Sequence, residues 1–230
     1  MERTPASPLP VVFIVDDDVS VRESLAAMVR FAGFNAETFE TAQNFLARPR
    51  ALSPSCLVLD INLPDLNGLD LQALVATDRT DMPIIFITGY GDVPMTVRAM
   101  KAGAVEFLTK PFDDLVLLDA IREAIGRSRQ AMGDAVELKA IQGRYASLSP
   151  REREVMALVV VGHLNKQVGG ELGISEITVK AHRGQVMRKM DARSLPELVT
   201  LAVRLRSGGT DMPAPPVQPG GTAPHTRRFA

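Results

Sequence analysis

The segment VVFIVDDD, residues 11–18, gives the first indication of how the N-terminal half of this chain folds. It is a short apolar run that ends in three consecutive carboxylates, and three further apolar runs are also followed by polar residues. These runs are 56–59 (CLVL) before Asp60, 84–87 (IIFI) before Thr88, and 105–108 (VEFL) shortly before Lys110. Such runs are typical of strands buried on both faces. Segments with helical spacing separate them, which predicts a parallel sheet with right-handed crossovers.

The polar residues at the ends of these runs predict a functional site, because ligands of open parallel sheets bind at the carboxyl ends of the strands. Asp18 is expected to cap a helix over residues 19–31. Asp16, Asp17 and Asp60, if close together, would repel one another by several kcal/mol per pair. Mg²⁺ would remove that repulsion, since it prefers carboxylate and phosphate oxygens. No His or Cys joins the cluster, which disfavours zinc.

A lysine and a hydroxyl that face carboxylates and a cation suit a phosphoryl group, whose oxygens need several positive or donor partners. We expect Asp60 to be the phosphoryl acceptor. Lys110 would pair with one phosphate oxygen, and Thr88 would donate a hydrogen bond to another.

The motifs VFIVDDD (12–18), LVLDINLPDLNG (57–68) and IIFITGYGDVPMTVRAMKAGAVEFLTKPF (84–112) resemble the receiver domain of two-component response regulators. Residues 91–107 are particularly similar to the FixJ type. The resemblance implies a flavodoxin-like α/β fold with a five-stranded parallel sheet, and a phosphoaspartate at Asp60. It also implies Mg²⁺ bound by Asp17, Asp60 and the backbone carbonyl of Asn62, with Asp16 nearby, and a switch in which Thr88 moves and Phe107 turns inward.

The C-terminal half reads as four short amphipathic helices: LSPREREVMALVVVG (148–162), NKQVGGELGIS (165–175), EITVKAHRGQVMRKM (176–190) and RSLPELVTLAVRLR (193–206). Ser149, Pro150 and Glu152 predict a capping box with proline at the first helical position. Gly173 is expected to end the second helix and Ser175 to cap the third. Short helices around a tight Gly turn match a helix-turn-helix, whose second helix enters the major groove.

On the third helix we expect an inward apolar face and an outward basic face. The inward residues are Ile177, Val179, Val186 and Met190, and the outward ones are Thr178, Lys180, His182, Arg183, Arg188 and Lys189. The segment from 148 to about 206 resembles the LuxR-type (NarL/FixJ) DNA-binding domain, an all-α four-helix fold. The resemblance implies that Lys180 and its neighbours read bases, that Lys166, Thr178 and Arg188 hold phosphates, and that His182 contacts the DNA backbone or packs between helices.

Three glycines depart from that family's pattern. Gly169 and Gly170 follow the Asn-Lys signal inside a helix, where each costs roughly 1 kcal/mol relative to Ala. We expect this helix to be frayed or to lie unusually close to its neighbour. Gly184 stands where relatives carry a base-contacting side chain, so fewer side chains would read the sequence.

The predicted organisation is a receiver domain over residues 8–128, a helical linker over 129–146, a helix-turn-helix domain over 147–206 and a disordered tail over 207–230. The alternative for the linker is two helices broken at Gly133. Charge follows this division: residues 1–130 carry 18 Asp and Glu and 12 Lys and Arg, whereas residues 131–206 carry 8 and 12. A basic second half suggests a polyanion partner.

The N-terminal sequence MERTPASPLP lacks the basic start and apolar core of a signal peptide, and no run reaches transmembrane length. We therefore expect a cytoplasmic protein with no membrane partner. The single cysteine, Cys56, is expected to be a small core residue.

These features together predict a transcription factor, not an enzyme. A sensor histidine kinase would phosphorylate Asp60, and the protein would then form a homodimer through residues 94–101 and bind promoter DNA, with RNA polymerase as a further partner. One alternative is a DNA-binding regulator that works without phosphorylation. Another is a Mg²⁺-dependent phosphotransferase or phosphatase.

Overall fold

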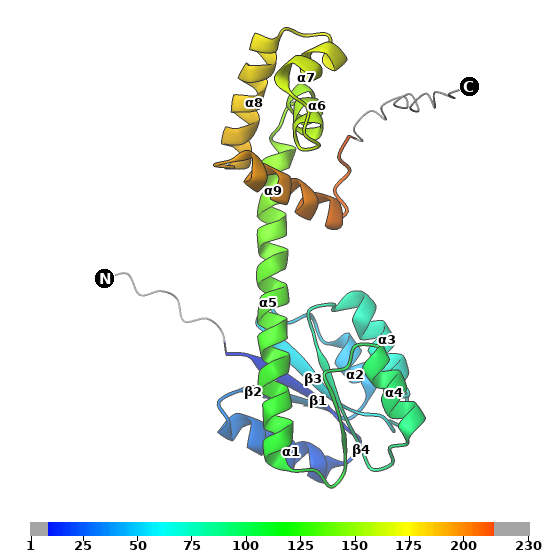
Figure 1. The fold of residues 1–230 in the computed structure, drawn as a ribbon. Coiled ribbons are helices and arrows are strands. Elements are labelled where there is room, and N and C mark those ends of the chain that lie inside the picture. Colours follow the sequence, from blue (N-terminus) through cyan, green and yellow to red (C-terminus); the bar gives the residue numbers. More distant parts are fainter. Residues whose placement is uncertain (1–8, 214–230) are drawn as a thin grey trace, which may run out of the picture. The chain divides into compact units, whose positions relative to one another are not determined.

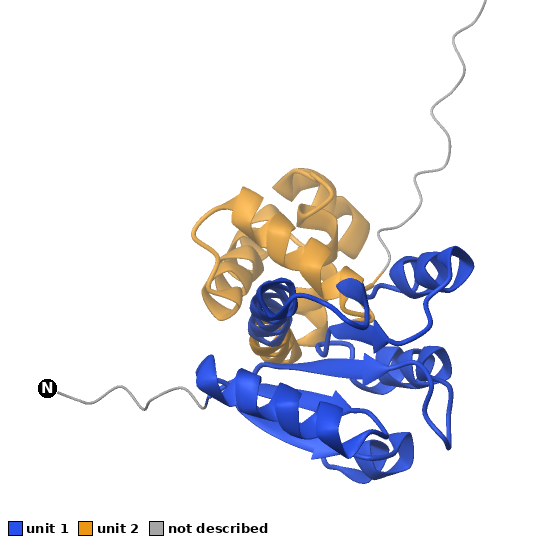
Figure 2. Ribbon diagram, turned by 90° about the horizontal axis from the view of Figure 1, so that it is seen from below, with its two compact units in different colours: residues 1–134 blue, residues 135–230 orange. Residues whose placement is uncertain are grey.

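A computed structural model of the chain describes residues 9–213, which form two compact units that meet in sequence between Asp134 and Ala135 (Figure 2). Unit 1 comprises the described residues up to Asp134, and unit 2 comprises those from Ala135 onward. The expected tail over 207–230 lies mostly outside the described residues. Within residues 208–213, Met212 is buried in the core of unit 2.

Unit 1 is built on a five-stranded parallel sheet with the strand order β2-β1-β3-β4-β5 (Figure 1). The strands are β1 (Val11–Val15), β2 (Asn35–Phe39), β3 (Ser55–Asp60), β4 (Ile84–Thr88) and β5 (Glu106–Thr109). Every residue of β1, β3 and β4 is buried, as the apolar runs predict for central strands. The predicted receiver-type α/β fold is confirmed.

The edge strands depart from the apolar-run pattern. β2 has the sequence NAETF, and each of its residues is exposed or half-buried, so it contains no apolar run. β5 is only half-buried, and it begins at Glu106 rather than at Val105. An edge strand is paired on one side only, and polar residues there remain in contact with water.

Helices cover both faces of the sheet, and a separate apolar core fills each interface (Figure 1). On one face lie α2 (Ala42–Ala47), α3 (Gly68–Asp78) and α4 (Val93–Lys101). They pack against Phe13, Leu57 and Phe86, which alternate along the strands with the residues of the other face. On that other face lie α1 (Val19–Phe31) and α5 (Asp114–Ala146). Asp18 caps α1, as predicted, and accepts hydrogen bonds from the backbone of Ser20 and Val21.

The last helix of unit 1 continues into unit 2. α5 has 33 residues without a break at Gly126 or Gly133. Its N-terminal part buries Leu117 and Ile121 against the sheet, and its C-terminal part buries Ile141 and Tyr145 in the core of unit 2.

Unit 2 is all-α and consists of the end of α5 together with α6 (Pro150–Val159), α7 (Asn165–Leu172), α8 (Glu176–Met190) and α9 (Leu195–Ser207). The predicted helix ends are confirmed. Ser149 and Glu152 form a capping box, Gly173 ends α7 in the left-handed conformation with φ 65°, and Ser175 caps α8.

Candidate functional site

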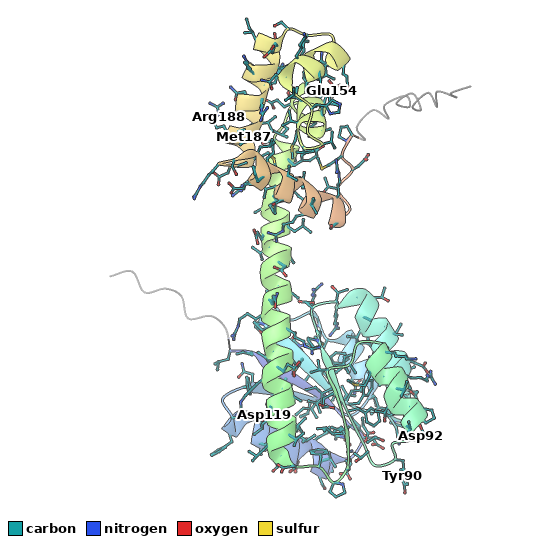
Figure 3. The ribbon with its side chains drawn as sticks, in the orientation of Figure 1. Tyr90, Asp92, Asp119, Glu154, Met187 and Arg188 are labelled. Atoms are coloured by element: carbon teal, nitrogen blue, oxygen red, sulfur yellow. The ribbon has the colours of Figure 1, made fainter. Side chains whose placement is uncertain are left out.

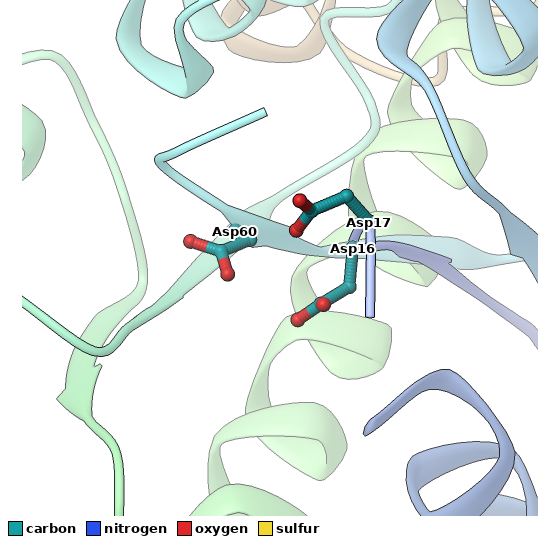
Figure 4. A group of neighbouring side chains, drawn as sticks. All are labelled: Asp16, Asp17 and Asp60. Atoms are coloured by element: carbon teal, nitrogen blue, oxygen red, sulfur yellow. The ribbon is translucent and has the colours of Figure 1, made fainter. Parts of the chain in front are cut away.

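Three carboxylates lie together at the carboxyl edge of the sheet (Figure 4). Asp16 and Asp17 follow β1, and Asp60 is the last residue of β3. One oxygen from each lies within 4.8 Å of the others. Asp16 and Asp60 are buried while Asp17 is exposed, so the cluster is open to solvent on one side. Because β1 and β3 are adjacent and parallel, they deliver these side chains to one point.

Lys110, beyond β5, connects two of these carboxylates. Its Nζ donates to Oδ2 of Asp16 at 2.6 Å and to Oδ2 of Asp60 at 2.8 Å. Burial raises the pKa of Asp16, although the lysine opposes that effect. Burial alone would lower the pKa of Lys110, but the hydrogen bonds to Asp16 and Asp60 outweigh it and the pKa is raised. Lys110 is thus held as a cation between two acids, and its peptide bond to Pro111 is cis.

The backbone around the acids is held in place by further hydrogen bonds. The Asp18 N–H donates to Oδ1 of Asp16 at 2.9 Å, and the Asn62 N–H donates to Oδ1 of Asp60 at 3.1 Å. Arg22 of α1 donates from Nη1 to the carbonyl oxygen of Asp16 at 2.7 Å. The sequence analysis missed Arg22, because an arginine one turn into an amphipathic helix gives no sign that it reaches back to the preceding strand.

Thr88 and Phe107, the expected switch residues, lie on neighbouring strands β4 and β5 in different packing environments. Thr88 is fully buried, and its Oγ1 accepts from the Tyr90 N–H and donates to the Tyr90 carbonyl, both at 3.2 Å. Both hydrogen bonds tie the Thr88 hydroxyl to the loop between β4 and α4. Figure 3 labels Tyr90 and Asp92 in this loop. Phe107 is half-buried, with its ring centroid 6.2 Å from that of Phe86. A Cβ built on Gly91 would lie 2.9 Å from the Phe107 ring, so the loop packs directly on that ring.

The donor set of the cluster fits Mg²⁺. Asp16, Asp17 and Asp60 offer only oxygen ligands, and two of them are already desolvated. Hard divalent cations of this size take few protein carboxylates and keep several waters, which the exposed side at Asp17 permits. The acidic cluster is therefore compatible with magnesium binding.

In unit 2, α7 and α8 form a helix-turn-helix whose tight turn depends on glycine. A Cβ built on Gly169 would lie 2.7 Å from the carbonyl oxygen of Ile174, so the close approach predicted for this helix occurs at Gly169. A Cβ built on Gly170 would meet nothing within 4 Å. Packing therefore explains why residue 169 is glycine, but it gives no reason for glycine at residue 170.

The predicted inward face of α8 is wrong at one residue. Val179, Val186 and Met190 are buried, but Ile177 is 80% exposed. Residues two apart on a helix lie about 200° apart around its axis, so Ile177 points to the side opposite the buried Val179.

The predicted outward residues of α8 differ in their exposure to solvent and in whether another side chain binds them. Thr178, Lys180 and Arg188 are exposed, and so is Lys166 on α7. His182 and Arg183 are half-buried, and Arg183 donates to Oδ1 of Asn165 at 3.1 Å. Lys189 is not free: its Nζ lies 2.6 Å from the buried carboxylate of Glu152. Figure 3 labels Met187 and Arg188 near the end of this helix.

Both parts of the chain match known families. The receiver domain of response regulators matches residues 12–122, and the luxR family of bacterial regulatory proteins matches residues 146–202. A doubly wound receiver with its acid cluster, together with a LuxR-type helix-turn-helix, defines a transcription regulator. The chain belongs to the FixJ/NarL-type response regulators of two-component systems.

Individual relatives are similar in sequence to this chain over most of its length. Nodulation protein W of Bradyrhizobium diazoefficiens is 48% identical, over 88% of this chain and 89% of the relative. Transcriptional regulatory protein FixJ of Rhizobium meliloti is 44% identical, over 84% and 94%. Among solved structures, response regulator StyR has a TM-score of 0.74 at 46% identity and covers 85% of this chain and 99% of its own. Full-length FixJ from B. japonicum has a TM-score of 0.52 at 40% identity, over 88% and 99%.

Within residues 9–213, none of the helices combines the length and the apolar character needed to cross a bilayer.

Proposed function

We propose that a sensor histidine kinase phosphorylates this response regulator on Asp60, and that the phosphorylated protein dimerises and binds promoter DNA. The observation that carries the proposal is the convergence of Asp16, Asp17 and Asp60 with the Lys110 ammonium group at one sheet edge. Asp60 accepts one hydrogen bond from the Lys110 Nζ and one from the Asn62 N–H, which together fix the orientation of its carboxylate.

In the proposed site, Asp16, Asp17, Asp60 and the backbone carbonyl of Asn62 would hold Mg²⁺. The ion would neutralise charge on the phosphoryl group as it is transferred. Lys110 is already within hydrogen-bond distance of Asp60 and would follow a phosphoryl oxygen with a short displacement. Its raised pKa keeps it protonated for that role.

The proposed switch follows from contacts around the β4–α4 loop. A phosphoryl group adds about −1.5 to −2 charge and three acceptor oxygens, which attract the Thr88 hydroxyl. Thr88 moves only if its two bonds to Tyr90 break or the loop moves with it. Because Gly91 packs on Phe107, motion of the loop frees space for the ring to turn inward. The outcome is a changed surface on α4 and β5.

The α4 surface offers apolar contacts for a second copy of the chain. Val93, Val97 and Met100 of this helix are between 42% and 76% exposed. Dimerisation through residues 94–101 would bring two helix-turn-helix domains to one duplex. Half-sites spaced by about one helical turn are the expected target. On α7 and α8, Lys166, Thr178 and Arg188 would contact phosphates, Lys180, with Arg183 nearby, would lie toward the bases, and His182 would contact the DNA backbone or pack between helices.

The decisive experiment treats the full chain with acetyl phosphate and Mg²⁺, and follows it by intact mass spectrometry and sedimentation velocity. The wild type should gain one phosphoryl adduct and sediment as a dimer. Asp60→Asn should gain neither. The matched control is Asp70→Asn, which removes an exposed carboxylate from the first turn of α3 and should behave as wild type.

Two outcomes would contradict the proposal. An adduct on Asp60→Asn would move the acceptor to another residue. A dimer that forms equally with and without the phosphodonor would favour the alternative in which the regulator binds DNA without phosphorylation.

A further inference from the structure

The exposed surface of α8 carries an apolar residue that contributes nothing to the core of unit 2. Ile177 is 80% exposed, near the start of the helix, next to its cap at Ser175. Exposing a large β-branched side chain on a helix surface forgoes the roughly 2 kcal/mol that its burial would provide. The fold of unit 2 therefore gives no reason for isoleucine at this position.

Ile177 lies on one face with three other exposed residues: Lys180, Ala181 and Gly184. Their spacing of three, four and seven residues places them along one stripe of the helix. We call this stripe the outer face of α8. Ala181 and Gly184 are the smallest side chains available, and a Cβ built on Gly184 would meet nothing within 4 Å. The outer face is thus shallow along its middle, with Ile177 standing above it at one end.

The outer face carries positive charge: Lys180 belongs to it and Arg188 lies one turn beyond Gly184, and both side chains are exposed. Among the described residues, Lys180 pairs with the exposed carboxylate of Glu176 at 3.3 Å, a contact that contributes little in water. A patch of one isoleucine and one alanine is far smaller than a stable protein interface needs. Its charge surroundings favour a polyanion that presents small apolar groups. The major groove of DNA presents one such group, the C5-methyl of thymine.

We propose that Ile177 is a specificity-determining residue, and that its side chain packs on the C5-methyl group of a thymine in each half-site. This inference rests on the DNA binding proposed above. The shallow outer face lets α8 approach the base edges closely, which brings the Ile177 methyl groups within contact distance of the groove floor. Lys180, one turn further along, reads the adjacent base by hydrogen bonding.

The test uses the full chain, phosphorylated with acetyl phosphate in Mg²⁺. A preferred duplex is first selected from a randomised duplex library. Each thymine of that duplex is then replaced in turn by deoxyuridine, which lacks only the methyl group, and the dissociation constant is measured by fluorescence anisotropy. Loss of one buried methyl contact should weaken binding of the wild type about fourfold at one thymine per half-site.

Ile177→Ala should bind the thymine and deoxyuridine duplexes equally well at that position. Because Ile177 is exposed, the variant should melt at the wild-type temperature. The matched control is Val136→Ala, which shortens a β-branched side chain that is 70% exposed on α5 and should keep the fourfold difference.

Wild-type indifference to every deoxyuridine, or an unchanged difference in Ile177→Ala, would overturn the assignment of Ile177 while leaving DNA binding intact. If the wild type selects no sequence and binds no duplex, the proposed DNA binding fails, and the role of Ile177 fails with it. Reduced self-association of Ile177→Ala with unchanged discrimination of the methyl group would make Ile177 a protein contact instead.

Discussion

The acid site of unit 1 joins side chains up to 94 residues apart, Asp16 and Lys110, whereas α8 of unit 2 presents its outer face within 15 consecutive residues. In the first site, Asp16 and Asp60 are buried and share the single cation Lys110, while Asp17 is exposed. The second is exposed, and its charges point to solvent. Removing one charge from a buried cluster leaves the remaining charges unpaired and destabilises the whole cluster. Removing one side chain from an exposed binding face removes only the contact that this side chain makes. Substitutions should therefore act cooperatively in unit 1 and nearly independently on α8.

Lys110→Met should have the strongest effect, and it tests whether the charges of the acid site in unit 1 depend on one another. Asp16 and Asp60 would remain buried without their cation, so the free energy of unfolding of unit 1 should fall by about 3 kcal/mol. Mg²⁺ should restore more stability to the variant than to the wild type. Calorimetry of the full chain with and without Mg²⁺ measures both effects. Lys101→Met, which removes an exposed lysine at the end of α4, is the control, and equal melting of the two variants would contradict the prediction.

Two glycine substitutions in α7 test a part of unit 2 where packing, and not charge, limits which side chain fits. Gly169→Ala places a methyl group 2.7 Å from the Ile174 carbonyl oxygen and should lower the free energy of unfolding by about 2 kcal/mol. Gly170→Ala meets nothing and should raise it by about 0.5–1 kcal/mol, because alanine is the better helix former. Urea unfolding followed by circular dichroism measures both. A loss in each variant would mean that the α7–α8 turn constrains both positions.

Lysine substitutions test whether the exposed face of α8 behaves independently. Lys180→Ala should weaken binding to the selected duplex about tenfold and relax specificity at one base pair. Lys189→Ala should affect DNA binding less, because its ammonium group is bound to Glu152. Anisotropy titrations over a series of salt concentrations separate a base contact from a phosphate contact. If Lys180→Ala weakens binding to all duplexes equally and reduces the salt dependence, Lys180 is a phosphate contact.

The smallest expected effect concerns the one buried ion pair of α6 and α8. A hydrogen bond from Lys189 holds the pKa of Glu152 below its ordinary value of 4.5 in the folded protein. The carboxylate therefore stabilises the fold above pH 4.5, and this contribution is lost as the pH falls through the lowered pKa. Glu152→Gln keeps the capping box but removes the charge, so it should cost about 1 kcal/mol at pH 7.

The difference between Glu152→Gln and the wild type should shrink as the pH falls below 4.5. Thermal melts of the full chain between pH 3 and pH 7 measure it. A difference that is constant over that range would show that the charge of Glu152 does not contribute. Glu154→Gln serves as the control, since Glu154 pairs with Arg151 near the surface (Figure 3).

Local sequence chemistry was sufficient for much of the fold. Capping by Asp18, Ser149 and Ser175 depends on a side chain and an amide two or three residues away, so the sequence alone predicts it. The central strands were found because burial on both faces requires continuous apolar runs. β2 could not be predicted from an apolar run, because an edge strand need not be buried on both faces.

Short-range spacing along the chain and the shared direction of parallel strands were enough to predict the α/β class of unit 1, the helix ends and the gathering of Asp16, Asp17 and Asp60. The hydrogen-bond and ion-pair partners of individual side chains emerged from the folded structure, in which Lys110 binds two acids, Thr88 is hydrogen-bonded to Tyr90 and Lys189 is paired with Glu152. The physical reason is that a contact between distant residues depends on how whole elements pack, and periodicity along one helix does not reveal which turn its neighbours cover.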